Sequence, residues 1–153
     1  MTDTTHSTTV EDTATTRYTY STGEVAGRFL AGLKEGKILA TRCSKSGLTY
    51  LPPRLYCERS FELCDSWIEA QLTGEIEVAT IVSKGFEGAP PTPYALAYVR
   101  LDNVDTAIGG FVRDLDMADV PAAMLSLSGG AKVRVVFNEE RVGDVTDFYF
   151  LLV

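Results

Sequence analysis

Histidine is almost missing from this sequence, and its single occurrence, His6, lies in a threonine-rich N-terminal stretch. Enzymes that use a serine or cysteine nucleophile need an imidazole beside it as the base. The rest of the chain has no such base, and we expect it to contain no catalytic residue. A glycine-rich phosphate loop between a strand and a helix is missing as well, which excludes the nucleotide-hydrolysing enzymes built around that loop.

Long apolar runs are also missing, so the sequence predicts no transmembrane helix. The N-terminus lacks the basic-then-apolar layout of a secretory signal, and we expect a cytoplasmic protein. Cysteine occurs only three times, as Cys43, Cys57 and Cys64. An odd number in a reducing compartment argues against a disulfide framework and leaves metal binding, reactivity or simple burial.

The first 16 residues differ from the rest of this 153-residue chain. Residues 1–16 are half threonine and have almost no apolar side chains, so burial cannot offset the entropy of ordering them. We predict that they form a disordered tail. The remaining length suffices for one domain with a sizeable core, or for one small domain with an appendage.

A short amphipathic helix is predicted after the tail. Ser21 or Thr22 can cap its start, and Gly36 ends it. Its apolar side chains recur at helical spacing; they are Val25, Phe29, Leu30 and Leu33. This stripe must be buried either in the chain's own core or against another subunit.

The stretch TRCSKSGLTYLPPRLYCERS resembles a pair of metal-binding knuckles in which half of the ligands are replaced. Zinc ribbons place two cysteines, two residues apart, in each knuckle. Here Cys43 is followed by Ser46, and Cys57 by Ser60. Serine hydroxyls do not ionise near neutral pH and are poor zinc ligands. Cys64 could supply a third thiolate if the chain folds back.

Three interpretations of this stretch stay open. It is a zinc site formed by Cys43, Cys57 and Cys64, a ribbon that has lost its metal, or a coincidence; the lost metal is the favoured interpretation. Structural zinc supplies about 10 kcal/mol of folding free energy, which apolar side chains would have to replace. The segment is rich in them: Leu48, Tyr50, Leu51, Leu55, Tyr56, Phe61 and Leu63.

After Trp67 the hydrophobic pattern alternates with a period of two. It predicts five strands, in the segments SWIEAQLTGEIEVATIVSK, PYALAYVRLD, TAIGGFVRDL, AKVRVVFNEE and VTDFYFLLV. The pair Gly109-Gly110 predicts a bulge or sharp bend, and a helical or looped segment around Pro121 interrupts the series. Five strands with one interruption favour a small Greek-key barrel of OB type over an open α+β sheet.

The predicted fold is therefore mainly β. An N-terminal helix and a degenerate, rubredoxin-like zinc ribbon occupy residues 17–66, and a five-stranded OB-fold barrel occupies residues 67–153.

Charge is unevenly distributed in this acidic chain, whose formal net charge is −7. Residues 34–59 carry six basic and two acidic side chains, whereas residues 60–153 carry six basic and fifteen acidic ones. A local basic patch on an acidic protein suits a phosphate-bearing small molecule or an acidic partner better than long nucleic acid. A merely solvated face is an equal alternative.

The order of these features resembles the family of zinc-ribbon plus OB-fold proteins known as domain of unknown function 35. The resemblance covers about residues 18–153. Its most specific element is the join GLKEGKILATRC between helix and ribbon, with PPR between the knuckles. The family's zinc ligands map onto Cys43, Ser46, Cys57 and Ser60, two of which are changed.

Members of this family look like small partners of thiolase-fold enzymes, and in other pathways of hydratases or aldolases that act on acyl-CoA. The resemblance implies a non-catalytic accessory subunit of a hetero-oligomer, most simply with a thiolase-type partner. It implies that the helix docks on that enzyme and that the basic ribbon helps to bind the CoA thioester. The candidate binding residues are Arg42, Lys45, Arg54, Arg59, Phe29 and Leu33. No membrane partner is expected.

Two other functions stay open. OB barrels bind single-stranded nucleic acid through aromatic platforms in a basic groove, but the barrel segment here is strongly acidic, and aromatic residues on strands more often lie in a core. The candidate platforms are Tyr94, Tyr98, Phe111, Phe137 and Phe148. A free-standing enzyme with a cysteine nucleophile is the other alternative, although a buried or formerly metal-binding cysteine is more common.

Overall fold

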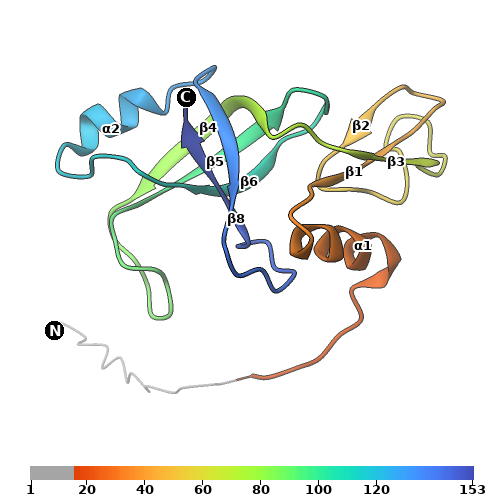
Figure 1. Cartoon of the computed structure of the whole chain (residues 1–153), viewed down its shortest axis with the longest axis horizontal. Helices are drawn as coiled ribbons and strands as arrows, with labels where there is room; N and C mark the ends of the chain where they lie inside the picture. The colour runs from red at the N-terminus through yellow and green to blue at the C-terminus, as the bar shows by residue number, and fades with distance from the viewer. Residues whose placement is uncertain (1–15) are drawn as a thin grey trace, which may run out of the picture.

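The computed structural model describes residues 16–153, so the predicted tail lies outside the described residues except for Thr16. The elements are, in order, α1 (Gly23–Lys34), β1 (Leu39–Arg42), β2 (Thr49–Tyr50), β3 (Ser66–Glu69), β4 (Thr73–Val82), β5 (Tyr94–Leu101), β6 (Ile108–Val112), α2 (Val120–Ser126), β7 (Lys132–Phe137) and β8 (Phe148–Leu152). Figure 1 shows α1 and the small sheet β1–β3 beside the larger barrel. No helix of the described residues is long and apolar enough to cross a membrane.

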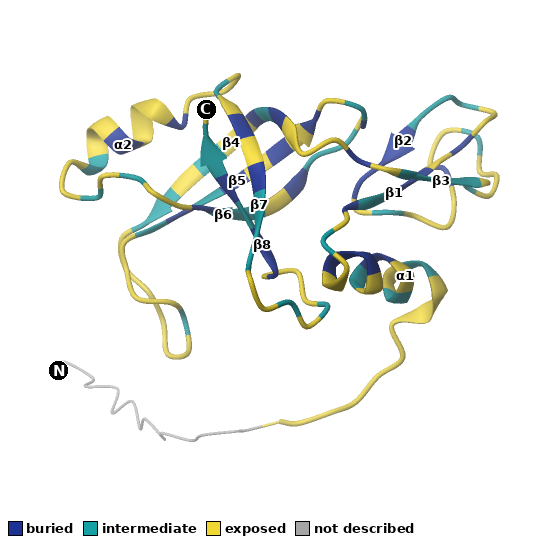
Figure 2. Cartoon of the chain, in the orientation of Figure 1, coloured by how far each residue is buried: buried dark blue, intermediate teal, exposed yellow. Residues whose placement is uncertain are grey.

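The helix α1 packs its apolar stripe on the chain's own core. Phe29 is 5% exposed and Leu33 is fully buried, and the buried side of α1 faces the rest of the fold in Figure 2. The helix ends at Lys34, and two residues later Gly36, with a φ of 75°, turns the chain so that Lys37 N–H donates to Gly32 C=O at 2.8 Å. The apolar stripe was expected to be buried either in the chain's own core or against another subunit, and the structure shows the first.

The ribbon-like part is a three-stranded antiparallel sheet in the order β2-β1-β3. Strand β3 pairs with β1 along its whole length, from Leu39↔Glu69 to Arg42↔Ser66. The predicted boundary between the two parts, after residue 66, therefore falls inside β3. Sequence alternation alone could not separate β3 from β4, because the two strands follow one another with only a short turn between them.

The larger part is a closed barrel in the order β4-β5-β6-β8-β7, in which β7 pairs back to β4. Only the contact between β6 and β8 is parallel. The residues of strand β5 alternate between core-facing and outward-facing positions, and Ala95, Ala97, Val99 and Leu101 are buried inside the barrel. The prediction of a mainly β chain with an N-terminal helix, a ribbon and a five-stranded OB-type barrel is confirmed.

The paired glycines of β6 do not form the predicted bulge. Gly109 and Gly110 pair regularly with Tyr98 and Ala97, and the register shift lies in β4 between Ile76 and Val78. Gly110 instead allows close packing, because a Cβ there would lie 2.7 Å from the Phe150 ring.

The ribbon and the barrel are joined by the connection between β5 and β6. Thr49 N–H donates to the Asp105 carboxylate at 2.8 Å, and Asp105 N–H returns a bond to Thr49 C=O at 2.9 Å. One residue further on, the Thr106 hydroxyl accepts from Leu51 N–H at 2.7 Å and donates to Leu51 C=O at 2.8 Å. A single hydrophobic core also includes side chains of α1, the ribbon and the barrel.

The loop between β7 and β8 joins the barrel to α1. Asp147, 3% exposed, accepts hydrogen bonds from the backbone N–H groups of Val142, Gly143 and Asp144, at 3.2, 2.7 and 3.1 Å. Within the same loop, the Arg141 guanidinium donates to Lys34 C=O at the end of α1. Burial alone would raise the pKa of Asp147, but these backbone donors outweigh it and lower the pKa below its ordinary value.

We predict that Asp147→Asn lowers the free energy of unfolding at pH 7 by about 1.5 to 3 kcal/mol, the usual loss of hydrogen bonds to a charged group. Because the folded-state pKa is depressed, this stabilisation is complete above the ordinary carboxyl value of 3.8 and disappears as the pH falls through the lower folded value. Urea unfolding at pH 7 and pH 3 measures both effects. The exposed Asp116, substituted in the same way, is the control; equal losses for the two variants would contradict this role of Asp147.

Candidate functional site

The two knuckles have the same backbone geometry. Cys43 C=O accepts from Gly47 N–H at 2.8 Å, and Cys57 C=O accepts from Phe61 N–H at 2.9 Å. The last residue of each turn is left-handed, with φ of 76° at Gly47 and 57° at Phe61. Only glycine adopts this conformation without cost, so Phe61 is held in a strained position, and its side chain is exposed. The turns therefore have the form of a ribbon whose ligand positions are 43, 46, 57 and 60.

The side chains at these four positions bond to one another across the two knuckles. Cys43 Sγ lies 3.2 Å from Ser60 Oγ, and Cys57 Sγ lies 3.2 Å from Ser46 Oγ. The Tyr50 hydroxyl, fully buried, lies 3.2 Å from Cys57 Sγ. We call these five residues the knuckle network. It forms the centre of a second, small core of the chain.

The knuckle network changes the acidity of its members. Burial would raise the pKa of Cys57, but hydrogen bonds with Ser46, Ser60 and Tyr50 outweigh burial and lower it to about 5. Hydrogen bonds with Ser60 and Ser46 lower the pKa of Cys43 too. The hydrogen bond to the Cys57 sulfur raises the pKa of Tyr50 to about 12. The hydroxyl groups around the Cys57 sulfur thus favour its deprotonated form.

Cys64 does not complete a metal site with the other two cysteines. Its backbone N–H donates to Leu55 C=O at 2.9 Å, and its side chain packs at the edge of the small core. Burial raises the pKa of its thiol. Within residues 16–153, no group of three or more His, Cys, Asp or Glu side chains is placed to hold a metal ion. The predicted three-thiolate set of Cys43, Cys57 and Cys64 is therefore not assembled.

The donor set of the knuckle network does not suit zinc. A structural ribbon site needs four thiolate or imidazole ligands around the ion. Two of the four positions, Ser46 and Ser60, carry hydroxyls that remain protonated near neutral pH. Each hydroxyl also accepts a backbone hydrogen bond, Ser46 from Leu48 at 3.2 Å and Ser60 from Glu62 at 3.4 Å.

Three of the four basic candidates make contacts within the ribbon. Lys45 pairs with Glu62 at 2.9 Å. Arg54 pairs with Glu58 and lies over the Tyr50 ring, 4.9 Å from its centroid. Arg42 donates to Thr49 Oγ1 at 3.1 Å. Arg59 is exposed. The net charge of the predicted basic patch is therefore partly offset by the acidic side chains beside it.

Phe29 and Leu33 lie inside the fold, as described above. They are not accessible to a partner in this conformation. Sequence spacing identified the apolar face of α1 correctly, but it could not say which surface this face covers.

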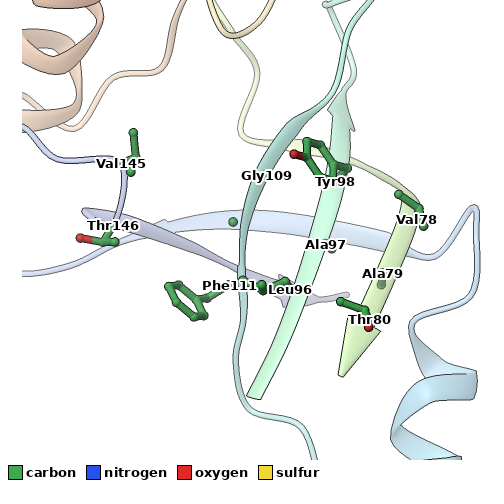
Figure 3. A pocket seen from close by; sticks show the side chains of 11 residues that line it. Val78, Ala79, Thr80, Leu96, Ala97, Tyr98, Gly109, Phe111, Val145 and Thr146 are labelled. Carbon is green, nitrogen blue, oxygen red and sulfur yellow. The ribbon is translucent and has the colours of Figure 1, made fainter. Parts of the chain in front are cut away.

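An apolar groove of about 450 Å³ lies on the outer surface of the barrel. Figure 3 shows its lining side chains coming from β4, β5 and β6 and from the segment just before β8. We call this hollow the outer groove; it is lined by Val78, Ala79, Thr80, Leu96, Ala97, Tyr98, Gly109, Gly110, Phe111, Val145 and Thr146. No lining residue is charged, and its volume is that of a small-molecule pocket.

At one place in the outer groove a tyrosine ring lies against a residue that has no side chain. Gly109 lies opposite Tyr98 in the sheet, and a Cβ at that position would touch the Tyr98 ring at 3.5 Å. Val78 and Tyr98 are 59% and 58% exposed, which is unusual for apolar groups that lie together on a sheet surface. The groove is thus an apolar surface that is exposed to solvent at Val78 and Tyr98.

Sequence reasoning did not find the outer groove. Of the five aromatic residues considered as platforms, Phe148 lies in the core. The Phe137 ring packs against it, with 6.4 Å between the two ring centroids. Tyr98 and Phe111 line the outer groove. The Phe111 ring also packs against Tyr94, with 5.7 Å between the ring centroids. The available signal was the apolar character of both alternating sets of positions in PYALAYVRL, where a solvated face would normally be polar.

Comparison with known proteins agrees with this architecture. Residues 30–63 match the rubredoxin-like zinc ribbon domain of ChsH2, and residues 67–138 match its C-terminal OB-fold domain. No curated protein sequence matches the chain.

Solved structures with the same fold include two that cover most of this chain. One is a DUF35-family protein of unknown function from Sulfolobus solfataricus, with 22% identity, a TM-score of 0.64 and coverage of 86% of this chain and 87% of that one. The other is described as the Ltp2-ChsH2(DUF35) aldolase, with 17% identity, a TM-score of 0.60 and coverage of 82% and 90%. With the two ChsH2 domains present in the same order, the chain belongs to the zinc-ribbon plus OB-fold family known as DUF35.

Proposed function

We propose that this chain is a non-catalytic subunit of a cytoplasmic hetero-oligomer that processes acyl-CoA thioesters, and that its partner is a thiolase-type enzyme. Two observations together support this most directly. Both ChsH2 domain models match the chain, and residues 16–153 contain no histidine. Such a chain can bind and position a thioester, but it lacks the usual base for acyl transfer.

The outer groove is the surface that we assign to the acyl part of the thioester. Its lining is apolar and uncharged. An acyl chain gains about 0.8 kcal/mol for each methylene that it buries there. The same lining disfavours single-stranded nucleic acid as the ligand, because that ligand requires basic side chains along the groove.

The ribbon would hold the phosphates of CoA. Arg42, Lys45, Arg54 and Arg59 remain the candidates for this contact. The ion pairs of Lys45 and Arg54 lie at the surface, where such pairs contribute about 0 to 1 kcal/mol. A phosphate group, which carries more charge than one carboxylate, can therefore displace Glu62 and Glu58 at little cost.

An aldolase as the partner enzyme is the second candidate. One observation favours it: the structural relative with a TM-score of 0.60 is described as the Ltp2-ChsH2(DUF35) aldolase. The two candidates share the role of this chain and differ only in the carbon–carbon bond chemistry of the enzyme beside it.

Purification of the tagged chain from its native cells tests the proposal. We expect a thiolase-type or aldolase enzyme to co-purify, and its activity on acyl-CoA to fall at least about tenfold when this chain is omitted. The isolated chain should turn over no acyl-CoA. Full activity of the partner alone, or turnover by the isolated chain, would overturn the proposal.

A further inference from the structure

The side chains at the four ligand positions of the ribbon form hydrogen bonds with one another. The two sulfur–oxygen contacts of 3.2 Å each join one knuckle to the other, Cys43 to Ser60 and Cys57 to Ser46. In a zinc ribbon the ion makes these cross-links between knuckles, because each knuckle supplies two of its four ligands. Here the side chains themselves connect the knuckles.

The interior of the knuckle network leaves no polar atom free for an ion. Tyr50 and the backbone N–H of Ser60 both contact Cys57 Sγ, at 3.2 and 3.4 Å. Within residues 16–153, no buried side-chain nitrogen or oxygen lacks a hydrogen-bond partner. An empty ligand cage would be expected to leave orphaned hydroxyl groups, and this one does not.

The ribbon also has a second support that a free-standing zinc ribbon lacks. Strand β2 and the residue after it are buried, namely Thr49, Tyr50 and Leu51. Asp105 and Thr106 of the barrel bind the backbone at Thr49 and Leu51 on either side of Tyr50. The barrel therefore helps to fix the strand that positions the Tyr50 hydroxyl.

From these observations we infer that the ribbon of this chain is metal-independent: side-chain hydrogen bonds between Cys43, Ser60, Cys57 and Ser46, completed by Tyr50, replace the zinc ion of the fold. The ligand geometry is nevertheless retained, since both knuckles keep the same backbone turns. It follows that restoring the two missing thiols should restore zinc binding.

Metal analysis of the full-length chain, expressed with added zinc, tests this inference. We expect the native chain to contain far less than one zinc per molecule and its thermal midpoint to be unchanged by EDTA. The double variant Ser46→Cys/Ser60→Cys should bind about one zinc per chain, the stoichiometry of a four-thiolate site. EDTA should lower its midpoint, because zinc binding is coupled to folding.

A matched control separates the site from a general effect of added cysteines. The double variant Ser83→Cys/Ser128→Cys adds two exposed thiols outside the ribbon and should bind no stoichiometric zinc. One zinc per native chain, with a midpoint lowered by EDTA, would overturn the inference of metal independence. If the Ser46→Cys/Ser60→Cys chain failed to bind zinc, or to show thiolate-to-metal absorption with Co²⁺, the claim of retained ligand geometry would be wrong. Neither outcome depends on the identity of the partner enzyme.

Discussion

The double variant Val78→Asp/Tyr98→Asp should assemble with the partner enzyme but raise its KM for long-chain acyl-CoA at least about tenfold. A tenfold change corresponds to the burial of roughly two methylene groups, and two carboxylates in an uncharged groove should remove at least that much. Both side chains are more than half exposed, so the fold should tolerate the change. Steady-state kinetics of the complex with long-chain and acetyl-CoA substrates measure the effect, and the KM for acetyl-CoA should be unchanged.

The control for this variant is Leu125→Asp, which changes an exposed leucine on α2 outside the outer groove. It should leave both KM values unchanged. If the groove variant raised the KM for acetyl-CoA and for long chains equally, the groove would not bind the acyl chain. Loss of the complex itself would instead make the groove a docking surface for the enzyme, which also contradicts its assignment to the acyl group.

The variant Leu33→Ala should lower the free energy of unfolding by about 2 to 5 kcal/mol, the range found for buried leucines. Leu33 is fully buried in the core that α1, the ribbon and the barrel share. The effect should therefore appear in one cooperative transition rather than as the loss of α1 alone. Denaturant unfolding followed by both far-UV circular dichroism and Trp67 fluorescence measures it.

Leu125→Ala is the control for the core variant. Leu125 is 77% exposed, and surface substitutions of this kind usually change stability by less than about 0.5 kcal/mol. Two separate transitions in the Leu33→Ala chain would contradict a single shared core. So would a loss no larger than that of Leu125→Ala.

Sequence patterns predicted the architecture well because each element has a strong local signal. The helical spacing of Phe29 and Leu33 identified the inner face of α1, and the period of two identified the strands of the barrel. The cysteine and serine spacing identified both knuckles, since these turns depend on local backbone bonds such as Gly47 N–H to Cys43 C=O. In each of these cases the deciding contacts lie close together in the sequence.

The features that escaped prediction depend on contacts between distant segments. The pairing of β3 with β1 joins residues 66–69 to residues 39–42, and nothing in their own pattern marks that partner. The role of Gly110 depends on the Phe150 ring, and the outer groove depends on which side of three strands remains uncovered.

The attachment of the ribbon to the barrel through Asp105 and Thr106 has a mechanical consequence. These residues lie in the connection between β5 and β6, the two neighbouring strands on which Tyr98 and Gly109 pair with each other at the outer groove. A displacement of the ribbon would therefore act directly on the connection between these two strands. The ribbon and the strands that line the outer groove are thereby tied together through four hydrogen bonds.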